Sequence, residues 1–282
     1  MNSPGNPASR ADAPIGVFDS GVGGLTVVRQ LIKLLPQENV VYFGDTARVP
    51  YGNKSSEVVR EYAAQDVRFL LSKKVKLIVV ACNTASAVAM DVVNAHSDVP
   101  AIGVIEPTAR EAIRLAGDRG VGVIGTLSTI SSCAYSTALK NFKKDVMVMT
   151  QACPLFVPLA EEGMFDHAAT DIVAREYLSQ FAGRIDAMIL GCTHYPLLRG
   201  AIAKAVGDDV RLVDAGEATA KAVQALLASA RILNQQKSRP MYGFYVSDFP
   251  LKFNEIAERF LGRKLEFVRR VHIYSNGVIA AQ

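Results

Sequence analysis

The chain has 282 residues, of which 50% are hydrophobic, and its formal net charge is +4. A chain of this length and composition can bury substantial cores in one or two domains, which excludes a small scaffold that depends on disulfide staples. The small net charge and the lack of aromatic residues among the basic ones argue against a nucleic-acid partner, and we expect none.

The N-terminal segment and the cysteines indicate a cytoplasmic protein. Residues 1–13 lack the charged and apolar regions of a signal peptide, and no stretch offers about 18 apolar residues without polar interruption. We therefore expect a disordered leader over residues 1–13 and no membrane contact. The four cysteines are too far apart for a CxxC metal site and are expected to be free thiols: Cys82, Cys133, Cys153 and Cys192.

From residue 14 onward, short β-branched runs alternate with longer amphipathic segments. The first four pairs are "PIGVFDS" with "GGLTVVRQLIKLL", "NVVYFGD" with "SSEVVREYAAQDVRFLLSKK", "VKLIVVAC" with "TASAVAMDVVNAH", and "VPAIGVI" with "EPTAREAIRLAG". The rhythm continues through "GVGVIGT", "TISSCAYSTALKNF", "DVMVMTQA", "DAMILGC" and "VRLVDA", and the chain closes with a strand, a helix and a strand. This alternation predicts an α/β fold with mainly parallel sheets and crossover helices.

Two segments of the first half resemble two of the second half. Residues 15–20, IGVFDS, resemble residues 121–126, VGVIGT, and the apolar run before Cys82 resembles the one before Cys192. Both pairs are separated by nearly the same length of chain, which favours a duplicated unit. We predict two pseudo-symmetric α/β domains, one formed by residues 14–106 with 216–282 and the other by residues 107–215.

Cys82 and Cys192 each end an apolar run, at the edge of a parallel sheet where ligands bind. A thiol at a helix N-terminus has a lowered pKa and a larger thiolate fraction, which we expect here. The alternative is that both are small core residues, since cysteine is often buried; their paired context favours the functional interpretation. For Cys133 and Cys153, which have no polar partner pattern, we expect structural packing.

Polar residues that can bind an amino acid surround these two thiols. Asn83, Thr84 and Thr193 can donate to a carboxylate or accept from an ammonium group, and His194 is two residues from Cys192. The loop "DSGVGGLT" meets neither nucleotide-binding glycine fingerprint, but it places Asp19 and Ser20 at the tip of the first strand. Asp45 also ends a strand, where a capping role and a site role are equally compatible with the sequence.

Eight motifs together resemble the glutamate racemases, a family within the aspartate/glutamate racemase superfamily. The resemblance covers residues 14 to about 275 and rests on "GVFDSGVGGLTV", "YFGDTARVPYG", "VVACNTASA", "GVIEPT", "GVIGTLSTI", "CPLFVPLAEEG", "LGCTHYPLL" and "VDAGEATA". It implies a two-domain fold with the active site in the cleft between the domains, no cofactor and no metal, and a homodimer in the cytoplasm. It also implies that L- and D-glutamate are interconverted to supply D-glutamate for bacterial peptidoglycan.

The resemblance implies a role for each matching residue. Two bases work on opposite faces of the α-carbon, Cys82 on the proton of D-glutamate and Cys192 on that of L-glutamate. Asp19 assists Cys82, His194 assists Cys192, and Glu161 is a further acid, with the adjacent Glu162 as an alternative register. Substrate contacts carry over to Asp19, Ser20, Tyr51, Gly52, Asn83, Thr84, Thr126, Thr193 and His194.

Three alternatives remain. Aspartate and hydantoin racemases share the twin thiols, although "VPYG" and "CTHYP" favour glutamate here. A thiol phosphatase would need C-x5-R, and the spacing from Cys192 to Arg199 is one residue too long. A non-catalytic flavodoxin-like binding module would not explain two thiols.

Overall fold

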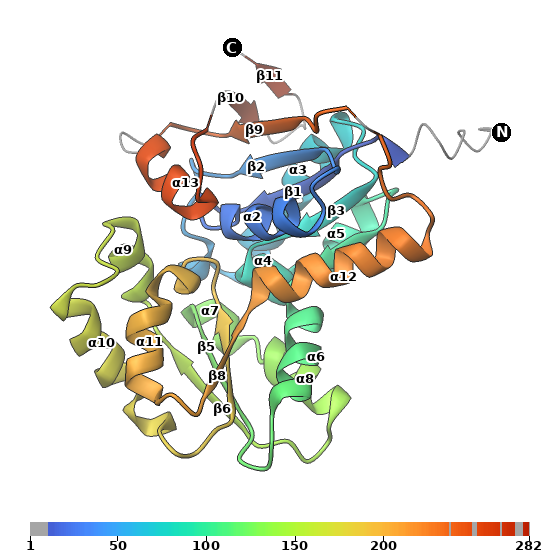
Figure 1. Ribbon diagram of the computed structural model, residues 1–282. Helices are drawn as coiled ribbons and strands as arrows, with labels where there is room; N and C mark the ends of the chain where they lie inside the picture. The colour runs from blue at the N-terminus through green and yellow to red at the C-terminus, as the bar shows by residue number, and fades with distance from the viewer. Residues whose placement is uncertain (1–10, 237, 250–252, 266, 274–278, 282) are drawn as a thin grey trace.

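The computed structural model describes residues 11–236, 238–249, 253–265, 267–273 and 279–281 and contains two β-sheets, one above the other in Figure 1. The seven-stranded sheet has the order β11-β10-β9-β2-β1-β3-β4, and the four-stranded sheet has the order β6-β5-β7-β8. The predicted α/β class with mainly parallel sheets is confirmed. The strands are β1 (Ile15–Asp19), β2 (Val40–Gly44), β3 (Leu77–Val80), β4 (Ala101–Gly103), β5 (Val121–Gly125), β6 (Val148–Ala152), β7 (Ala187–Gly191), β8 (Arg211–Asp214), β9 (Tyr242–Val246), β10 (Val268–Ile273) and β11 (Ile279–Ala281).

The two sheets repeat one strand order. β2-β1-β3-β4 in the larger sheet corresponds to β6-β5-β7-β8 in the smaller one, and every pair within these two sets is parallel. The larger sheet adds β9 and β10, which are parallel, and β11, which is antiparallel to β10. In each sheet the chain passes from β1 or β5 to the neighbouring strand on one side and then to the neighbouring strand on the other side. Ligands of open α/β sheets bind in the crevice that forms at this change of direction.

Helices cover both faces of the larger sheet, because successive apolar side chains along its strands point to opposite faces and both faces must be buried. Along β1, Val17 packs into a core shared with α2, whereas Phe18 packs on the opposite face with α3. α12 follows β8 and crosses from the lower half to pack on α2 (Figure 1). The helices are α2 (Leu25–Leu34), α3 (Ser56–Ser72), α4 (Asn83–Val88), α5 (Met90–His96), α6 (Ile105–Leu115), α7 (Leu127–Ser131), α8 (Ala134–Phe142), α9 (Phe156–Glu161), α10 (Ala168–Leu178), α11 (Arg199–Val206), α12 (Ala215–Ser229) and α13 (Phe253–Leu261), with short 3-10 turns η1 (Tyr51–Asn53), η2 (Ser179–Phe181) and η3 (Tyr195–Leu198).

The segment expected as one helix in "TISSCAYSTALKNF" is broken at Cys133. Cys133 has a left-handed backbone with φ +56° between α7 and α8, and it is exposed. The Ser132 hydroxyl accepts a hydrogen bond from the Ala134 N–H at 3.2 Å, which competes with helical pairing. The prediction that Cys133 packs in the interior is therefore wrong, whereas Cys153 is fully buried as expected.

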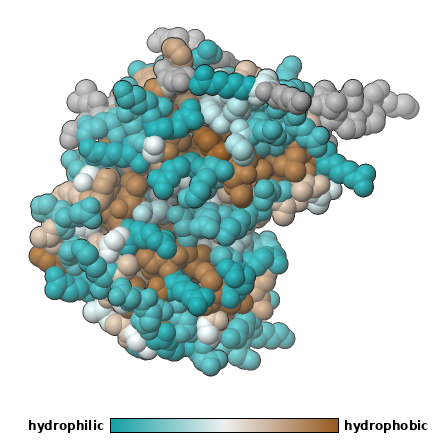
Figure 2. Space-filling view, in the orientation of Figure 1, coloured by the Kyte–Doolittle hydropathy of each residue, from teal (hydrophilic) through white to brown (hydrophobic). Residues whose placement is uncertain are grey.

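The visible face is mostly hydrophilic, with hydrophobic residues in separate patches on its upper and lower parts (Figure 2). Within the described ranges, no helix combines the length and the apolar character needed to cross a membrane. The predicted boundaries near residues 106 and 216 fall in the first turns of α6 and α12, and the domain division stays a prediction.

A buried ion pair ties three distant segments together at the start of β3. Lys76 Nζ lies 2.6 Å from Glu38 Oε2, and both side chains are almost fully buried. The ammonium group also donates to the Ala11 carbonyl at 2.6 Å and to the Ile232 carbonyl at 2.8 Å. The end of the predicted leader is thus fastened to the sheet at Ala11, while residues 1–10 of that leader lie outside the described residues.

Glu38→Gln should destabilise the protein. The amide cannot balance the buried Lys76 ammonium, and an uncompensated buried charge costs about 3–5 kcal/mol. Urea denaturation should show this decrease in the free energy of unfolding. Glu217→Gln is the control, because Glu217 forms an exposed pair with Lys221, and its effect should be far smaller. Equal effects of the two substitutions would contradict the importance of the buried pair.

Candidate active site

The candidate site lies where the carboxyl ends of four strands face one another across the two sheets. Ser20 follows β1 and Cys82 follows β3 in the larger sheet, whereas Thr126 follows β5 and Cys192 follows β7 in the smaller one. These residues line one cavity of about 30 Å³. The complete lining is Ser20, Val49, Pro50, Tyr51, Gly52, Cys82, Asn83, Thr84, Thr126, Val157, Cys192, Thr193 and His194.

The first thiol is buried beside a carboxyl group. Cys82 Sγ accepts a hydrogen bond from the Ala85 N–H at 3.5 Å and lies 3.6 Å from Ser20 Oγ. Burial and the negative charge of nearby Asp19 raise the pKa of Cys82 to about 12. The lowered pKa expected for Cys82 is therefore wrong: α4 has only six residues, and its N-terminus does not outweigh burial and a like charge.

The second thiol has a basic neighbour. Cys192 Sγ lies 3.8 Å from His194 Nδ1, and His194 Nε2 lies 3.0 Å from Glu161 Oε1. Burial alone would lower the pKa of His194, but Cys192 and Glu161 together raise it to about 10. At neutral pH the imidazole is protonated and can donate to both neighbours, while Phe260 of α13 packs edge-on against it with ring centroids 5.0 Å apart.

Two buried polar atoms at this site have no hydrogen-bond partner among the described residues: Asn83 Nδ2 and Asp19 Oδ1. The Asn83 amide is oriented, because its Oδ1 accepts from the Tyr135 hydroxyl at 2.6 Å and leaves Nδ2 as a free donor. Asp19 Oδ2 accepts from the Gly21 N–H at 2.9 Å and leaves Oδ1 as a free acceptor. A buried unpaired donor and acceptor suit a ligand that carries both a carboxylate and an ammonium group.

Three threonine hydroxyls join the two halves of the site. Thr84 Oγ1 lies 3.0 Å from Thr126 Oγ1 and 3.3 Å from Thr129 Oγ1, and the last two oxygens are 3.0 Å apart. Thr84 belongs to the chain after β3 and the other two to the chain after β5. The hydroxyls therefore bridge the structural halves directly at the edge of the cavity.

The glycine loop lets the two halves approach closely at Gly23. A Cβ atom at Gly23 would lie 2.1 Å from Thr193 Oγ1 and 2.7 Å from the His194 ring. Thr26 Oγ1, in the next turn, lies 3.2 Å from the Thr193 carbonyl oxygen. Gly23, the second glycine in "DSGVGGLT", thus leaves room for Thr193 and His194 of the other half.

Sequence reasoning missed Tyr135 and Thr129, and it left Asp45 open. Tyr135 lies on α8 and reaches Asn83 across 52 residues of sequence, so no local pattern could indicate the contact. Asp45 does not line the cavity; its carboxylate accepts a hydrogen bond from the Tyr51 hydroxyl at 2.5 Å. The predicted Asp19 and Glu161 lie just behind the lining, in contact with Gly21 and His194 respectively.

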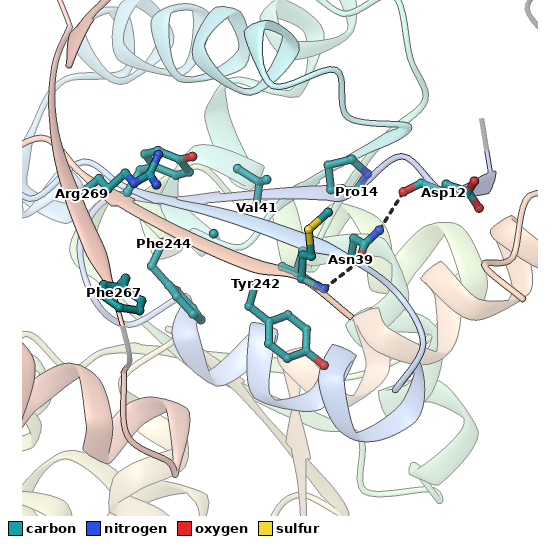
Figure 3. A pocket seen from close by; sticks show the side chains of 12 residues that line it. Asp12, Pro14, Asn39, Val41, Tyr242, Phe244, Phe267 and Arg269 are labelled. Carbon is teal, nitrogen blue, oxygen red and sulfur yellow. Dashed lines mark hydrogen bonds between the residues drawn. The ribbon is translucent and has the colours of Figure 1, made fainter. Parts of the chain in front are cut away.

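A larger cavity of about 370 Å³ lies against β2 and β9, where Asn39 bonds both the Asp12 carbonyl and the Met241 N–H (Figure 3). Its lining is mainly apolar and aromatic and includes neither a cysteine nor a histidine. The two thiols and His194 line the smaller cavity, which is where the structure supports acid–base chemistry. Within the described residues, no three His, Cys, Asp or Glu side chains come together as metal ligands.

Comparison with known proteins identifies the family. The sequence profile of the Asp/Glu/Hydantoin racemases matches residues 15–223. The chain belongs to this family. A glutamate racemase from Syntrophus aciditrophicus is 51% identical over 261 residues, which cover 92% of this chain and 97% of the relative. The protein is thus a racemase, an isomerase, and its predicted resemblance to the glutamate racemases is confirmed.

Solved structures agree with this membership. The glutamate racemase from Francisella tularensis, in complex with D-glutamate, has a TM-score of 0.88 and 41% identity, covering 95% of this chain and all (100%) of its own. The enzyme from Thermus thermophilus, in complex with β-chloro-D-alanine, has a TM-score of 0.85 and 47% identity, covering 94% and 99%. The two-sheet architecture is therefore that of solved glutamate racemases.

Cys82 should resist alkylation at neutral pH. Because its pKa is raised to about 12, it is a thiol there, and only the thiolate reacts with iodoacetamide. Peptide mass mapping should show rapid modification of the exposed Cys133 and little of Cys82, whose rate should rise about tenfold per pH unit on the alkaline side. Modification of Cys82 at a rate that does not change between neutral and alkaline pH would contradict the raised pKa.

Proposed function

We propose that this protein interconverts L- and D-glutamate without a cofactor, with Cys82 and Cys192 as its two acid–base groups. The observation that carries the proposal is that both sulfur atoms line one cavity, one from each sheet, and each has its own polar neighbour. Inversion at a carbon requires a proton to leave one face and another to arrive on the opposite face. The Francisella relative, solved with D-glutamate, supports glutamate as the substrate.

With L-glutamate, the Cys192 thiolate removes the α-proton and becomes a thiol. The electron pair of the broken C–H bond moves into the α-carboxylate, and the Cys82 thiol then delivers its proton to the opposite face of the α-carbon. A C–H bond is broken and a C–H bond is formed, and the negative charge passes from one sulfur to the other. D-glutamate reacts by the same steps in reverse, starting from the form of the enzyme in which Cys82 has given up its proton and Cys192 carries one.

The surroundings match this exchange. The His194 imidazolium lies 3.8 Å from Cys192 Sγ, where it balances the thiolate that starts the reaction of L-glutamate. The raised pKa of Cys82 keeps that residue protonated and ready to donate. The free Asn83 Nδ2 donor stabilises charge that builds on the carboxylate, and the Asp19 carboxyl group, just behind the lining, favours the ammonium group from there.

Substrate entry requires the halves to separate. A cavity of about 30 Å³ has room for little more than water. We propose that residues 14–106 with 216–282 and residues 107–215 move apart as two domains, breaking the Thr84–Thr126 and Asn83–Tyr135 contacts, and close again over glutamate. Closure then excludes water and strengthens each hydrogen bond to the substrate.

We extend the proposal to the cellular role. Resemblance to bacterial glutamate racemases supports a cytoplasmic enzyme whose D-glutamate supplies peptidoglycan synthesis. The same resemblance supports a homodimer as the working form. Sedimentation of the purified protein would test the dimer separately from the activity.

Cys82→Ala and Cys192→Ala should each abolish racemization, because each removes the proton carrier of one face. Loss of the circular dichroism of L-glutamate in buffer and reductant alone, without pyridoxal phosphate or metal, measures the wild-type activity. In D2O, each turnover should place one deuterium on the α-carbon of the product.

Cys133→Ala and Cys153→Ala are the matched controls and should keep most of the activity. Cys133 is exposed, and Cys153 is buried outside the cavity lining. Near wild-type rates after replacement of Cys82 or Cys192 would refute the two-base assignment.

Tyr135→Phe should raise the KM for glutamate about three- to tenfold with a smaller effect on kcat, since a lost hydrogen bond leaves the Asn83 amide free to turn. Tyr177→Phe is a suitable control, because the Tyr177 ring packs on Phe156 away from the cavity lining. Steady-state kinetics of the two variants would measure these changes in KM and kcat. An unchanged KM in Tyr135→Phe would rule out orientation of Asn83 by this hydroxyl.

A further inference from the structure

A buried carboxyl group that the proposed reaction does not use lies behind the wall of the cavity. Asp66, on α3, is fully buried, and its Oδ2 lies 3.1 Å from the hydroxyl oxygen of Tyr51. Its Oδ1 accepts a hydrogen bond from Arg48 Nη2 at 3.2 Å. Tyr51 lines the cavity, so Asp66 is one side chain removed from the substrate.

A second carboxyl group competes for the same partners. Asp45 Oδ2 lies 2.5 Å from the Tyr51 hydroxyl and 2.5 Å from Arg48 Nε, and Asp45 Oδ1 accepts from the Ser247 hydroxyl at 2.9 Å. Asp45 thus has three donors, at shorter distances than the contacts of Asp66. The guanidinium group of Arg48 also donates to Gln65 Oε1 at 2.5 Å and stacks over the Tyr62 ring, 4.1 Å from its centroid.

The numbers of available hydrogens and positive charges indicate that the two carboxyl groups differ in protonation. Tyr51 has one hydroxyl hydrogen, and the shorter contact assigns it to Asp45. The 3.1 Å contact between Asp66 and Tyr51 then needs a hydrogen from Asp66 itself. One cation, Arg48, balances one carboxylate, and a second buried carboxylate would be uncompensated.

We propose that Asp66 is a positioning residue for the substrate pocket, which acts as a neutral carboxylic acid that donates its hydrogen to the Tyr51 hydroxyl and so holds the 50–52 turn against the cavity. The role in substrate binding rests on the proposed racemase function. The electrostatics agree: burial and the negative charge of Asp45 raise the pKa of Asp66 well above its ordinary value, and Arg48 only partly opposes them.

The position of the 50–52 turn matters because there is no free space between this turn and Thr126. Gly52 lies so close to Thr126 that a Cβ atom at Gly52 would be 2.7 Å from Thr126 Cβ. Tyr51 and Gly52 both line the cavity, while the Tyr51 hydroxyl is occupied by two carboxyl groups that do not. The hydroxyl therefore anchors the turn from behind, and displacement of the anchor would move the wall that faces the substrate.

The matched pair Asp66→Asn and Asp45→Asn tests the proposal. An amide reproduces the neutral acid at position 66: Nδ2 donates to the Tyr51 oxygen and Oδ1 accepts from Arg48. At position 45 the same change removes the carboxylate that lies closer to Arg48 and turns an amide donor toward the hydrogen-bond donors of Tyr51, Arg48 and Ser247. Asp66→Asn should keep KM and kcat within about twofold of the wild type, whereas Asp45→Asn should raise KM about tenfold or more.

Asp66→Ala should raise the KM about three- to tenfold with a smaller change in kcat, the effect of one lost hydrogen bond. If that variant does not fold, Tyr51→Phe removes this bond together with the bond to Asp45 and should raise KM at least as much. Asp91→Asn makes the same chemical change on an exposed carboxylate paired with Arg60 and should leave the kinetics unchanged.

A readout independent of activity is the infrared difference spectrum between the wild type and Asp66→Asn at neutral pH. A carbonyl band of a protonated carboxyl group, present only in the wild type, is expected. The proposal is overturned if that band is missing, if Asp66→Asn loses as much affinity as Asp66→Ala, or if neither Asp66→Ala nor Tyr51→Phe raises KM. Absence of racemization in the wild type with the band present would instead refute the proposed function and leave the proton on Asp66 established.

Discussion

Parallel strands in a sheet all end at the same edge, and the site depends on this constraint. β1 and β3 in one sheet and β5 and β7 in the other direct the chains that follow them toward a shared cleft. Because the two sheets share one strand order, each delivers a thiol from the corresponding position. The same geometry places backbone N–H groups and short polar side chains around both thiols, which an amino-acid ligand requires.

The repeat is symmetric in its backbone but not in its charges. Cys82 lies beside a buried carboxyl group, Asp19, while Cys192 lies beside a protonated imidazole held by Glu161. A negative neighbour favours the thiol, and a positive neighbour favours the thiolate. In the proposed reaction of L-glutamate, this difference suits Cys82 as the proton donor and Cys192, beside the imidazolium, as the proton acceptor.

Buried charges in this protein are stabilised by pairing. Lys76 and Glu38 form a closed ion pair far from the site, whereas Arg48 faces the two carboxyl groups of Asp45 and Asp66. A single cation cannot balance two buried anions, so a proton has to make up the difference. In the proposed arrangement behind Tyr51, a neutral acid positions a pocket wall without touching the ligand.

The sequence by itself determined the α/β class, the duplicated unit, and the positions of Cys82 and Cys192 at strand ends. These are local properties: an apolar period, a glycine after a strand, and a run of motifs can be recognised without knowing what packs against them. It failed at Cys133, where a serine side chain competes with helical pairing, and on the direction of the pKa of Cys82.

Only the tertiary structure decided which groups surround the thiols and support the cavity wall. The contacts of Glu161 with His194, Tyr135 with Asn83, and Asp66 with Tyr51 each join segments that are apart in the chain. The protonation of a buried group depends on the sum of its desolvation and the charges around it, which no single segment contains. For that physical reason the chemistry of the residues was visible in the sequence, but their charge states were not.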